Sequence, residues 1–141
     1  MQVSHTPAAV SAVFDDPNLI AYAGLVPVLR LAERCGLSRL VAEKVKLTGA
    51  RNGAGAAADA KVTSIVAGMA AGADSIEDLG GLRHGAMPTA FAGIRAPSTL
   101  GTFLRAFTHG HGLQLHAVHR TFLGELAAHT PLLPGSGEKA F

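Results

Sequence analysis

The sequence predicts an all-α protein, a compact bundle of about six short helices with an extended N-terminal arm and a C-terminal linker. Apolar residues recur at helical spacing through most of residues 15–130. Much of the 48% hydrophobic fraction is Ala, Leu and Val, whereas aromatic residues reach only 5% and Trp is absent. This composition is typical of helices that pack closely through small residues. The 17 glycines exceed average usage and predict many helix ends.

The N-terminal third predicts three short helical stretches. Residues 15–17 (Asp-Asp-Pro) have the form of a helix start, with an Asp cap and Pro in the first turn. Pro27 is expected to break this helix and restart it, and Gly36 is expected to end the second stretch. Ser38 is expected to cap a third helix. Its inward residues would be Leu40, Val41 and Val45.

The middle of the chain predicts a loop followed by a central helix. Residues 46–58 have no periodicity and contain three glycines, which indicates a flexible loop. Asp59 is expected to cap a strongly apolar helix that ends at Gly72. The core-facing residues of this helix would be Val62, Ile65, Val66, Met69 and Ala70. Ser-Ile-Glu-Asp at 75–78 has the form of a capping box that opens a short helix, and residues 82–97 are expected to be irregular.

The C-terminal part predicts two helices joined by a turn. A helix is expected to open at Pro97 and to align Leu100, Phe103, Leu104 and Phe107. The His-Gly-His-Gly sequence at 109–112 should interrupt it before a long final helix. Residues 98–129 therefore have the outline of a helix-turn-helix, which any helical hairpin shares. The candidates for reading a DNA groove would be Gln114, His116, His119, Arg120 and Thr121.

The formal net charge of +2 is unevenly distributed. Residues 80–141 hold five Lys and Arg residues against two acids, together with six of the seven histidines. A mildly cationic C-terminal half permits an anionic partner such as DNA, because Lys and Arg neutralise phosphates wherever the fold clusters them. An ordinary solvated surface is the alternative. The candidate DNA-binding residues are Lys46, Arg51, Lys61, Arg83, Arg95, Arg105 and Arg120.

No catalytic or metal site is expected in this chain. Four histidines near one turn could offer ring nitrogens to a metal, but no Cys lies near them and the one nearby acid is Glu125. Solvated histidines, or weak phosphate contacts, are the alternatives. These histidines are His109, His111, His116 and His119. The acids Asp59, Asp74 and Asp78 all lie at helix starts, where capping explains them. The glycines form no phosphate-binding loop.

The remaining sequence features favour a soluble cytoplasmic protein. A single cysteine, Cys35, excludes an internal disulfide and fits a reducing compartment, and its apolar surroundings predict a buried structural thiol. No signal peptide is visible. The longest apolar stretch, Ser64–Ala73, is too short to span a bilayer, so no membrane association is expected.

Four segments carry a resemblance to a known family. They are Phe14–Leu37 (FDDPNLIAYAGLVPVLRLAERCGL), Gly68–Leu79 (GMAAGADSIEDL), Leu82-Arg83 and Ala96–Phe107 (APSTLGTFLRAF). In this order they resemble the N-terminal region of bacterial insertion-sequence transposases of the DDE type, which have an RNase H-like core. The resemblance is to the actinobacterial branch of the insertion-sequence family thirteen-eighty, related to family four.

The resemblance implies a role in DNA transposition. In that family a helical region precedes the catalytic core, and the full enzymes cut and rejoin DNA at terminal inverted repeats with divalent metal, such as Mg, held by three carboxylates. The N-terminal region is associated with binding element ends and with assembly, so double-stranded DNA and a homodimer are the expected partners. None of the triad positions is present in this chain, and we therefore expect no catalysis and no cofactor in it.

The domain organisation expected from these arguments has three parts. Residues 1–14 would form an arm, residues 15–130 a helical domain for DNA recognition and assembly, and residues 131–141 a linker toward a missing RNase H-like core. Two rival functions remain open. The Ala-rich helix at 60–72 could serve oligomerisation in a protein–protein module without DNA contact, and the histidines could build a small metal-dependent enzyme.

Overall fold

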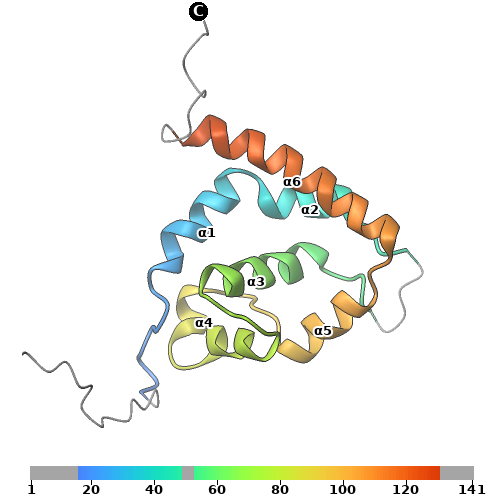
Figure 1. Ribbon diagram of the computed structural model, residues 1–141. Helices are drawn as coiled ribbons and strands as arrows, with labels where there is room; N and C mark the ends of the chain where they lie inside the picture. The colour runs from blue at the N-terminus through green and yellow to red at the C-terminus, as the bar shows by residue number, and fades with distance from the viewer. Residues whose placement is uncertain (1–15, 49–52, 131–141) are drawn as a thin grey trace, which may run out of the picture.

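The computed structural model describes residues 16–48 and 53–130, and this part of the chain is all-helical, without strands (Figure 1). The predicted all-α fold class is therefore confirmed. The predicted arm at 1–14 and the predicted linker at 131–141 lie outside the described residues. The helices are α1 (Leu25–Arg34), α2 (Leu37–Lys44), α3 (Ala58–Ala70), the 3-10 helix η1 (Glu77–Arg83), α4 (Met87–Ala90), α5 (Pro97–Arg105) and α6 (His109–His129).

The first helix begins later than the sequence predicts. Residues 16–24 form turns, and the Asp16 carboxylate accepts a hydrogen bond from the Asn18 N–H at 2.8 Å, so it closes a turn and not a helix. α1 begins at Leu25 and places Pro27 in its first turn, where a missing N–H needs no partner. The predicted break at Pro27 is therefore wrong, because the helix starts just before this residue.

Gly36 joins α1 to α2. Its φ of 78° is left-handed, and its N–H donates to the Glu33 carbonyl at 2.9 Å, which ends α1 as predicted. Gly36 also holds the N-cap position of α2. The predicted capping role of Ser38 is wrong, because Ser38 lies inside α2 and its hydroxyl donates to the Glu33 carboxylate.

α3 ends at Ala70, and the predicted glycine, Gly72, terminates it two residues later. The Gly72 N–H donates to the Met69 carbonyl at 3.1 Å, and the Ala73 N–H donates to the Gly68 carbonyl at 2.9 Å. These two bonds form a Schellman motif, which requires the left-handed φ of 90° that Gly72 adopts. At the other end, the predicted Asp59 cap is wrong, because Asp59 lies in the first turn of α3 and Ala57 occupies the N-cap position.

Helix α2 lies between α3 and α6 and packs against both (Figure 1). The larger core cluster joins these helices to α1 and α5, and its buried members are Ala32, Leu37, Leu40, Val41, Val45, Leu47, Ala58, Phe103 and Val118. The smaller cluster lies between α1, α3 and the α4 region, and its buried members are Leu25, Ala67, Leu82, Met87 and Phe91. α3 contributes to both clusters and so connects the two halves of the core.

The inner face of α3 differs from the predicted one. Its buried residues are Ala58, Lys61, Ser64, Ala67 and Gly68. Val62, Ile65 and Val66 are only half-buried, and Met69 is 68% exposed. The prediction failed because apolar residues surround most of this helix, so periodicity could not select a face. The neighbouring elements instead approach the side of Ser64, Ala67 and Gly68, where small residues leave room for them.

The segment after α3 contains the predicted capping box. The Ser75 hydroxyl and Ser75 N–H both donate to the Asp78 carboxylate, at 2.7 and 2.9 Å, and the Asp78 N–H lies 3.3 Å from the Ser75 hydroxyl. These hydrogen bonds, led by that of the Ser75 hydroxyl, hold the pKa of Asp78 below its usual value. Asp78 is the second residue of η1, so the box spans the start of this helix. The short helix α4 lies within residues 82–97, for which the sequence predicts irregular structure.

The connection between α5 and α6 is shorter than predicted. α6 begins at His109, so the glycine-containing 109–112 segment forms its first turn and does not interrupt the helix. The Thr108 N–H donates to His111 Nδ1 at 3.0 Å. Thr108 is the N-cap residue of α6, and His111 accepts this hydrogen bond as the third helical residue of a capping box. The His111 ring also packs edge-on against Phe107, with ring centroids 5.8 Å apart.

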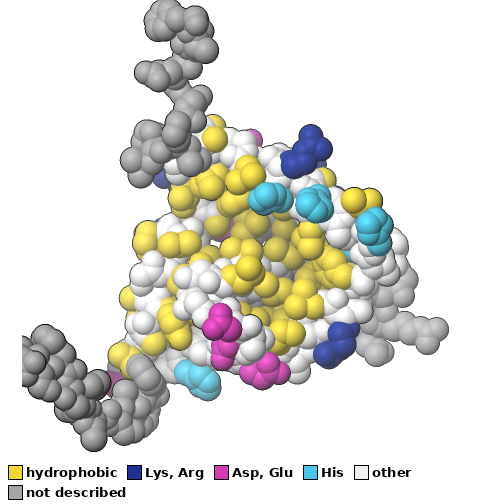
Figure 2. Space-filling view, in the orientation of Figure 1, with side chains coloured by type: hydrophobic (Ala, Val, Ile, Leu, Met, Phe, Trp, Pro, Cys, Tyr) yellow, Lys and Arg dark blue, Asp and Glu magenta, His cyan; other side chains and the backbone are white. Residues whose placement is uncertain are grey.

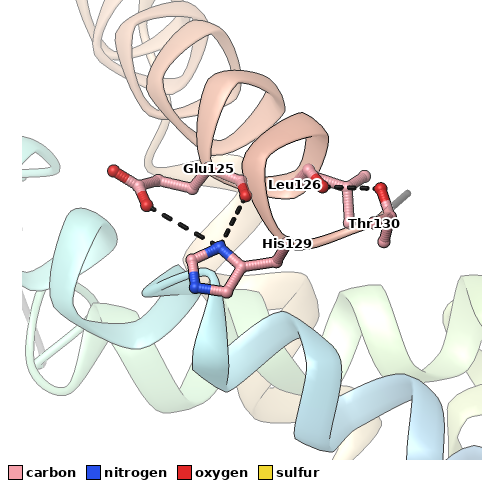
Figure 3. Close-up of polar contacts among 4 residues, drawn as sticks. All are labelled: Glu125, Leu126, His129 and Thr130. Carbon is pink, nitrogen blue, oxygen red and sulfur yellow. Dashed lines mark hydrogen bonds and ion pairs between the residues drawn. The ribbon is translucent and has the colours of Figure 1, made fainter. Parts of the chain in front are cut away.

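In the last turn of α6, two side chains contact backbone carbonyl oxygens of the preceding turn (Figure 3). His129 Nδ1 lies 2.8 Å from the Glu125 carbonyl oxygen and 4.0 Å from the Glu125 carboxylate. The Thr130 hydroxyl donates to the Leu126 carbonyl at 2.6 Å. The Leu126 carbonyl is one of the last four of α6, which have no N–H partner within the helix, so the Thr130 hydroxyl satisfies it.

Gly68 offers a direct test of the close packing on α3. A Cβ at this position would lie 1.7 Å from Leu79 Cδ2, so we expect Gly68→Ala to lower the free energy of unfolding by about 1–3 kcal/mol through overpacking. The matched control is Gly124→Ala on α6, where a Cβ would meet nothing within 4 Å, and it should raise that free energy by about 0.5–1 kcal/mol. Urea unfolding followed by circular dichroism measures both. Equal effects of the two substitutions would contradict this packing.

Candidate nucleic-acid interface

The structure divides the seven candidate DNA-binding residues into three groups. Arg51 lies outside the described residues. Lys61 is buried, with 5% of its surface exposed. The other five are exposed at the surface: Lys46, Arg83, Arg95, Arg105 and Arg120.

Three of the exposed arginines surround α5. Arg83 is the last residue of η1, which packs against α5. Arg95 precedes α5, and its backbone N–H donates to the Ser64 hydroxyl at 3.0 Å, which ties the start of α5 to α3. Arg105 is the last residue of α5, and its guanidinium folds back over Gly101, so that a Cβ added to this glycine would lie 3.3 Å from Arg105 Nη1. The two ends of this nine-residue helix are about 12 Å apart along its axis.

The other two exposed cations lie beside α6. The Lys46 N–H donates to Gln114 Oε1 at 2.8 Å, so the segment after α2 is held against α6. The Lys46 ammonium donates to the Ala42 carbonyl at the end of α2. Arg120 lies near the middle of α6. The structure therefore does not gather all five cations at one point.

The four exposed candidate arginines have no acidic partner in the part of the chain that the structure describes. The ion pairs found there, within 4.0 Å, are Arg39 with Glu43 and His129 with Glu125. A guanidinium without a carboxylate partner keeps its donors available for a phosphate, which it can bind through two parallel hydrogen bonds.

Lys61 is a structural residue in this fold. Its ammonium donates to the carbonyls of Gly53 and Ala54, at 3.1 and 2.9 Å, and lies 5.5 Å from the centre of the Phe103 ring. Burial, and then the positive charge of Arg95, lower the pKa of Lys61 below its usual value of 10.5. We therefore leave Lys61 out of the candidate interface, since its donors are used to fix the loop before α3.

The helix-turn-helix outline is present as α5, a connection at residues 106–108, and α6. Two of its five candidate groove-reading side chains have internal partners. Gln114 binds the Lys46 backbone, and the Thr121 hydroxyl donates to the Ala117 carbonyl at 3.0 Å. His116, His119 and Arg120 remain exposed on α6. Insertion of α6 into a DNA groove stays a prediction.

Figure 2 shows that hydrophobic side chains, and not cations, occupy the centre of one face of the molecule. Lys and Arg side chains lie at separate points along the border of this face. The sequence indicated an interaction surface on the helix at 60–72 as one alternative, but not an apolar surface that includes α6. The signal for it was the excess of apolar residues on α3 and α6, which is larger than one buried stripe per helix requires.

The histidines do not form a metal site within the described ranges, where no three His, Cys, Asp or Glu side chains are grouped to hold an ion. His111 is used in the cap of α6, and His109, His116 and His119 are exposed. Cys35 is 1% exposed, in agreement with its predicted place as a buried thiol.

Comparison of the chain with protein-family models, with curated proteins and with solved structures finds no match. Across residues 16–48 and 53–130, no helix has the length and apolar character that a membrane span requires.

The buried ammonium of Lys61 predicts a specific pH dependence of stability. Because its pKa is lowered by folding, the unfolded chain binds this proton more tightly between the folded pKa and 10.5. The contribution of Lys61 to stability therefore rises as the pH increases toward 10.5. The unfolding free energy of the wild type minus that of Lys61→Met should therefore increase as the pH rises through this interval. Urea unfolding at several pH values measures it, and a difference that is flat or falls with pH would contradict the assignment.

Proposed function

We propose that this chain is the N-terminal part of a DDE transposase, which binds transposon-end DNA and assists assembly in the cytoplasm but does not cut DNA alone. The observation that carries the proposal is the in-order resemblance of four segments to the N-terminal region of such enzymes. Two of its segments contain candidate DNA-binding arginines, and both of these are exposed: Arg83 at the end of η1 and Arg105 at the end of α5.

The arrangement of the arginines supports a phosphate-binding role. Arg83, Arg95 and Arg105 surround one short helix and are exposed, and none has an acidic partner among the described residues. Contacts of this kind position a protein on the duplex and release counterions, so affinity falls as the salt concentration rises. Arg120, His116 and His119 on α6 are the side chains that remain available to read base edges.

In the full enzymes of this family, divalent metal held by three carboxylates performs strand cleavage. The segments of this chain that resemble the family include none of those carboxylates. The helical domain would therefore supply recognition, and a catalytic core would supply the chemistry.

A protein–protein module without DNA contact is the second candidate. The hydrophobic face in Figure 2 favours it, because exposed apolar patches of this kind mark interaction surfaces. Measuring DNA affinity separately from self-association distinguishes these two functions.

The first test removes the three arginines around α5. The triple variant Arg83→Ala, Arg95→Ala and Arg105→Ala should bind inverted-repeat DNA more weakly, and the slope of log K against log salt should become shallower by about 3. Fluorescence anisotropy with a labelled duplex over a salt series measures both quantities.

The matched control for this variant is Arg30→Ala, Arg34→Ala and Arg39→Ala, which removes the same charge from exposed positions on α1 and α2. It should retain most of the affinity and the wild-type slope. If the two triple variants lose the same affinity, the arginines around α5 are not the DNA contact.

A further inference from the structure

The first turn of α6 is capped by a histidine at a position where a capping box ordinarily has Glu or Gln. His111 is the third residue of this helix, and its Nδ1 accepts the hydrogen bond from the Thr108 N–H at 3.0 Å. A Glu carboxylate or a Gln amide oxygen remains an acceptor at neutral and mildly acidic pH. An imidazole nitrogen accepts a hydrogen bond only while it carries no proton. The cap of α6 therefore depends on the protonation state of one ring.

The contacts of the His111 ring are those of a neutral imidazole. Because Nδ1 accepts the Thr108 N–H, the proton of the neutral ring lies on Nε2. The residue is half-buried, and its ring packs edge-on against Phe107. In residues 16–48 and 53–130, no Asp or Glu lies within 4.0 Å of this ring to compensate a positive charge. A cation would also lie in the first turn, at the positive end of the helix dipole.

The charged groups on the elements beside this turn are mostly bases. α6 packs against α2, where the Glu43 carboxylate is paired with the Arg39 guanidinium at 3.1 Å. The other titratable groups around the start of α6 are His109 on α6, Arg105 at the end of α5, Lys44 at the end of α2 and Lys46 after it. A proton on His111 would therefore add positive charge to a basic region.

A proton on Nδ1 changes the hydrogen bonds of the cap. The Thr108 hydroxyl lies 3.1 Å from Nδ1 and can accept from a protonated ring, but the Thr108 N–H then has no acceptor. The turn that follows holds Gln114, whose side chain binds the Lys46 N–H at 2.8 Å. Loosening of the first turn therefore acts on the attachment between α6 and the segment after α2.

The other end of α6 responds differently to a proton (Figure 3). His129 Nδ1 lies 2.8 Å from the Glu125 carbonyl oxygen, which can only accept, so Nδ1 donates to it. Protonation of this ring keeps that hydrogen bond and adds a positive charge 4.0 Å from the Glu125 carboxylate. The charge also lies at the negative end of the helix dipole. A proton therefore removes the cap at the start of α6 and is compatible with the contact at its end.

We propose that His111 is a proton-sensitive cap, which loosens the start of α6 in mildly acidic solution while the end of the helix stays held. At neutral pH the ring accepts the Thr108 N–H and closes the first turn. As the pH falls through about 6.5, where histidines generally take up a proton, this acceptor is lost. The contribution of the cap to stability is therefore present above this range and lost below it. The device goes beyond the proposed function and does not depend on DNA binding.

The test compares the wild type with His111→Gln, which keeps an acceptor but cannot take up a proton, and with His111→Ala, which has none. Urea unfolding of the full chain is followed by circular dichroism at pH 8 and at pH 5. At pH 8 the wild type should match His111→Gln and exceed the urea midpoint of His111→Ala by about 0.5 M. At pH 5 the wild type should fall about 0.5 M below His111→Gln. The control is His119→Gln at an exposed position in the middle of α6, whose midpoint should differ from that of the wild type equally at both pH values.

A local measurement on the wild type shows where the change occurs. In ¹H–¹⁵N spectra, the Thr108 amide proton should shift with the same midpoint pH as the His111 ring. If this amide does not follow the ring, the proposal is wrong. Equal losses of urea midpoint by the wild type and His111→Gln between pH 8 and pH 5 would overturn it as well, and so would a His111→Ala variant as stable as the wild type at pH 8.

Discussion

The fold depends on the small inner face of α3, where side chains leave room for four neighbouring elements. Gly68 admits the Leu79 side chain, and Ser64 accepts a hydrogen bond from the Arg95 backbone that positions the start of α5. Lys61 closes the loop before α3 by binding two carbonyls, and it lies over the Phe103 ring. Polar atoms buried in this way are tolerated because each one has a partner. Among the described residues, no buried side-chain nitrogen or oxygen lacks one.

This arrangement also determines which surfaces remain for partners. Because α3 turns its small residues inward, its larger residue Met69 faces outward. α6 packs mainly against α2, so the side carrying Leu123 is left uncovered. The result is an apolar face, with the exposed arginines around α5 and on α6 at separate places. The apolar and the cationic surfaces of this domain are therefore made by different residues.

The sequence predicted the helical class, the glycines that end α1 and α3, and the box at 75–78, because each follows from local hydrogen bonding. It correctly placed Leu40, Val41 and Val45 in the core. It misplaced the start of α1, because Pro27 is compatible both with a break and with a first turn. It assigned Lys61 to a surface, since nothing local indicates that the carbonyls of residues 53 and 54 turn toward it. The excess of apolar residues on α3 and α6 indicates that some apolar surface stays uncovered, but its position depends on which helices pack together, and no local pattern reports this.

The central claim is that this helical domain recognises element-end DNA. The most direct measurement is the affinity of the 141-residue chain for duplexes from the DNA that flanks its gene, where the proposed function expects a terminal inverted repeat. A scrambled duplex of equal length and composition is the comparison, and both are titrated over a salt series. We expect tighter binding to the repeat, with log K falling linearly as log salt rises. Equal affinity for the two duplexes, or no binding at low salt, would contradict the claim.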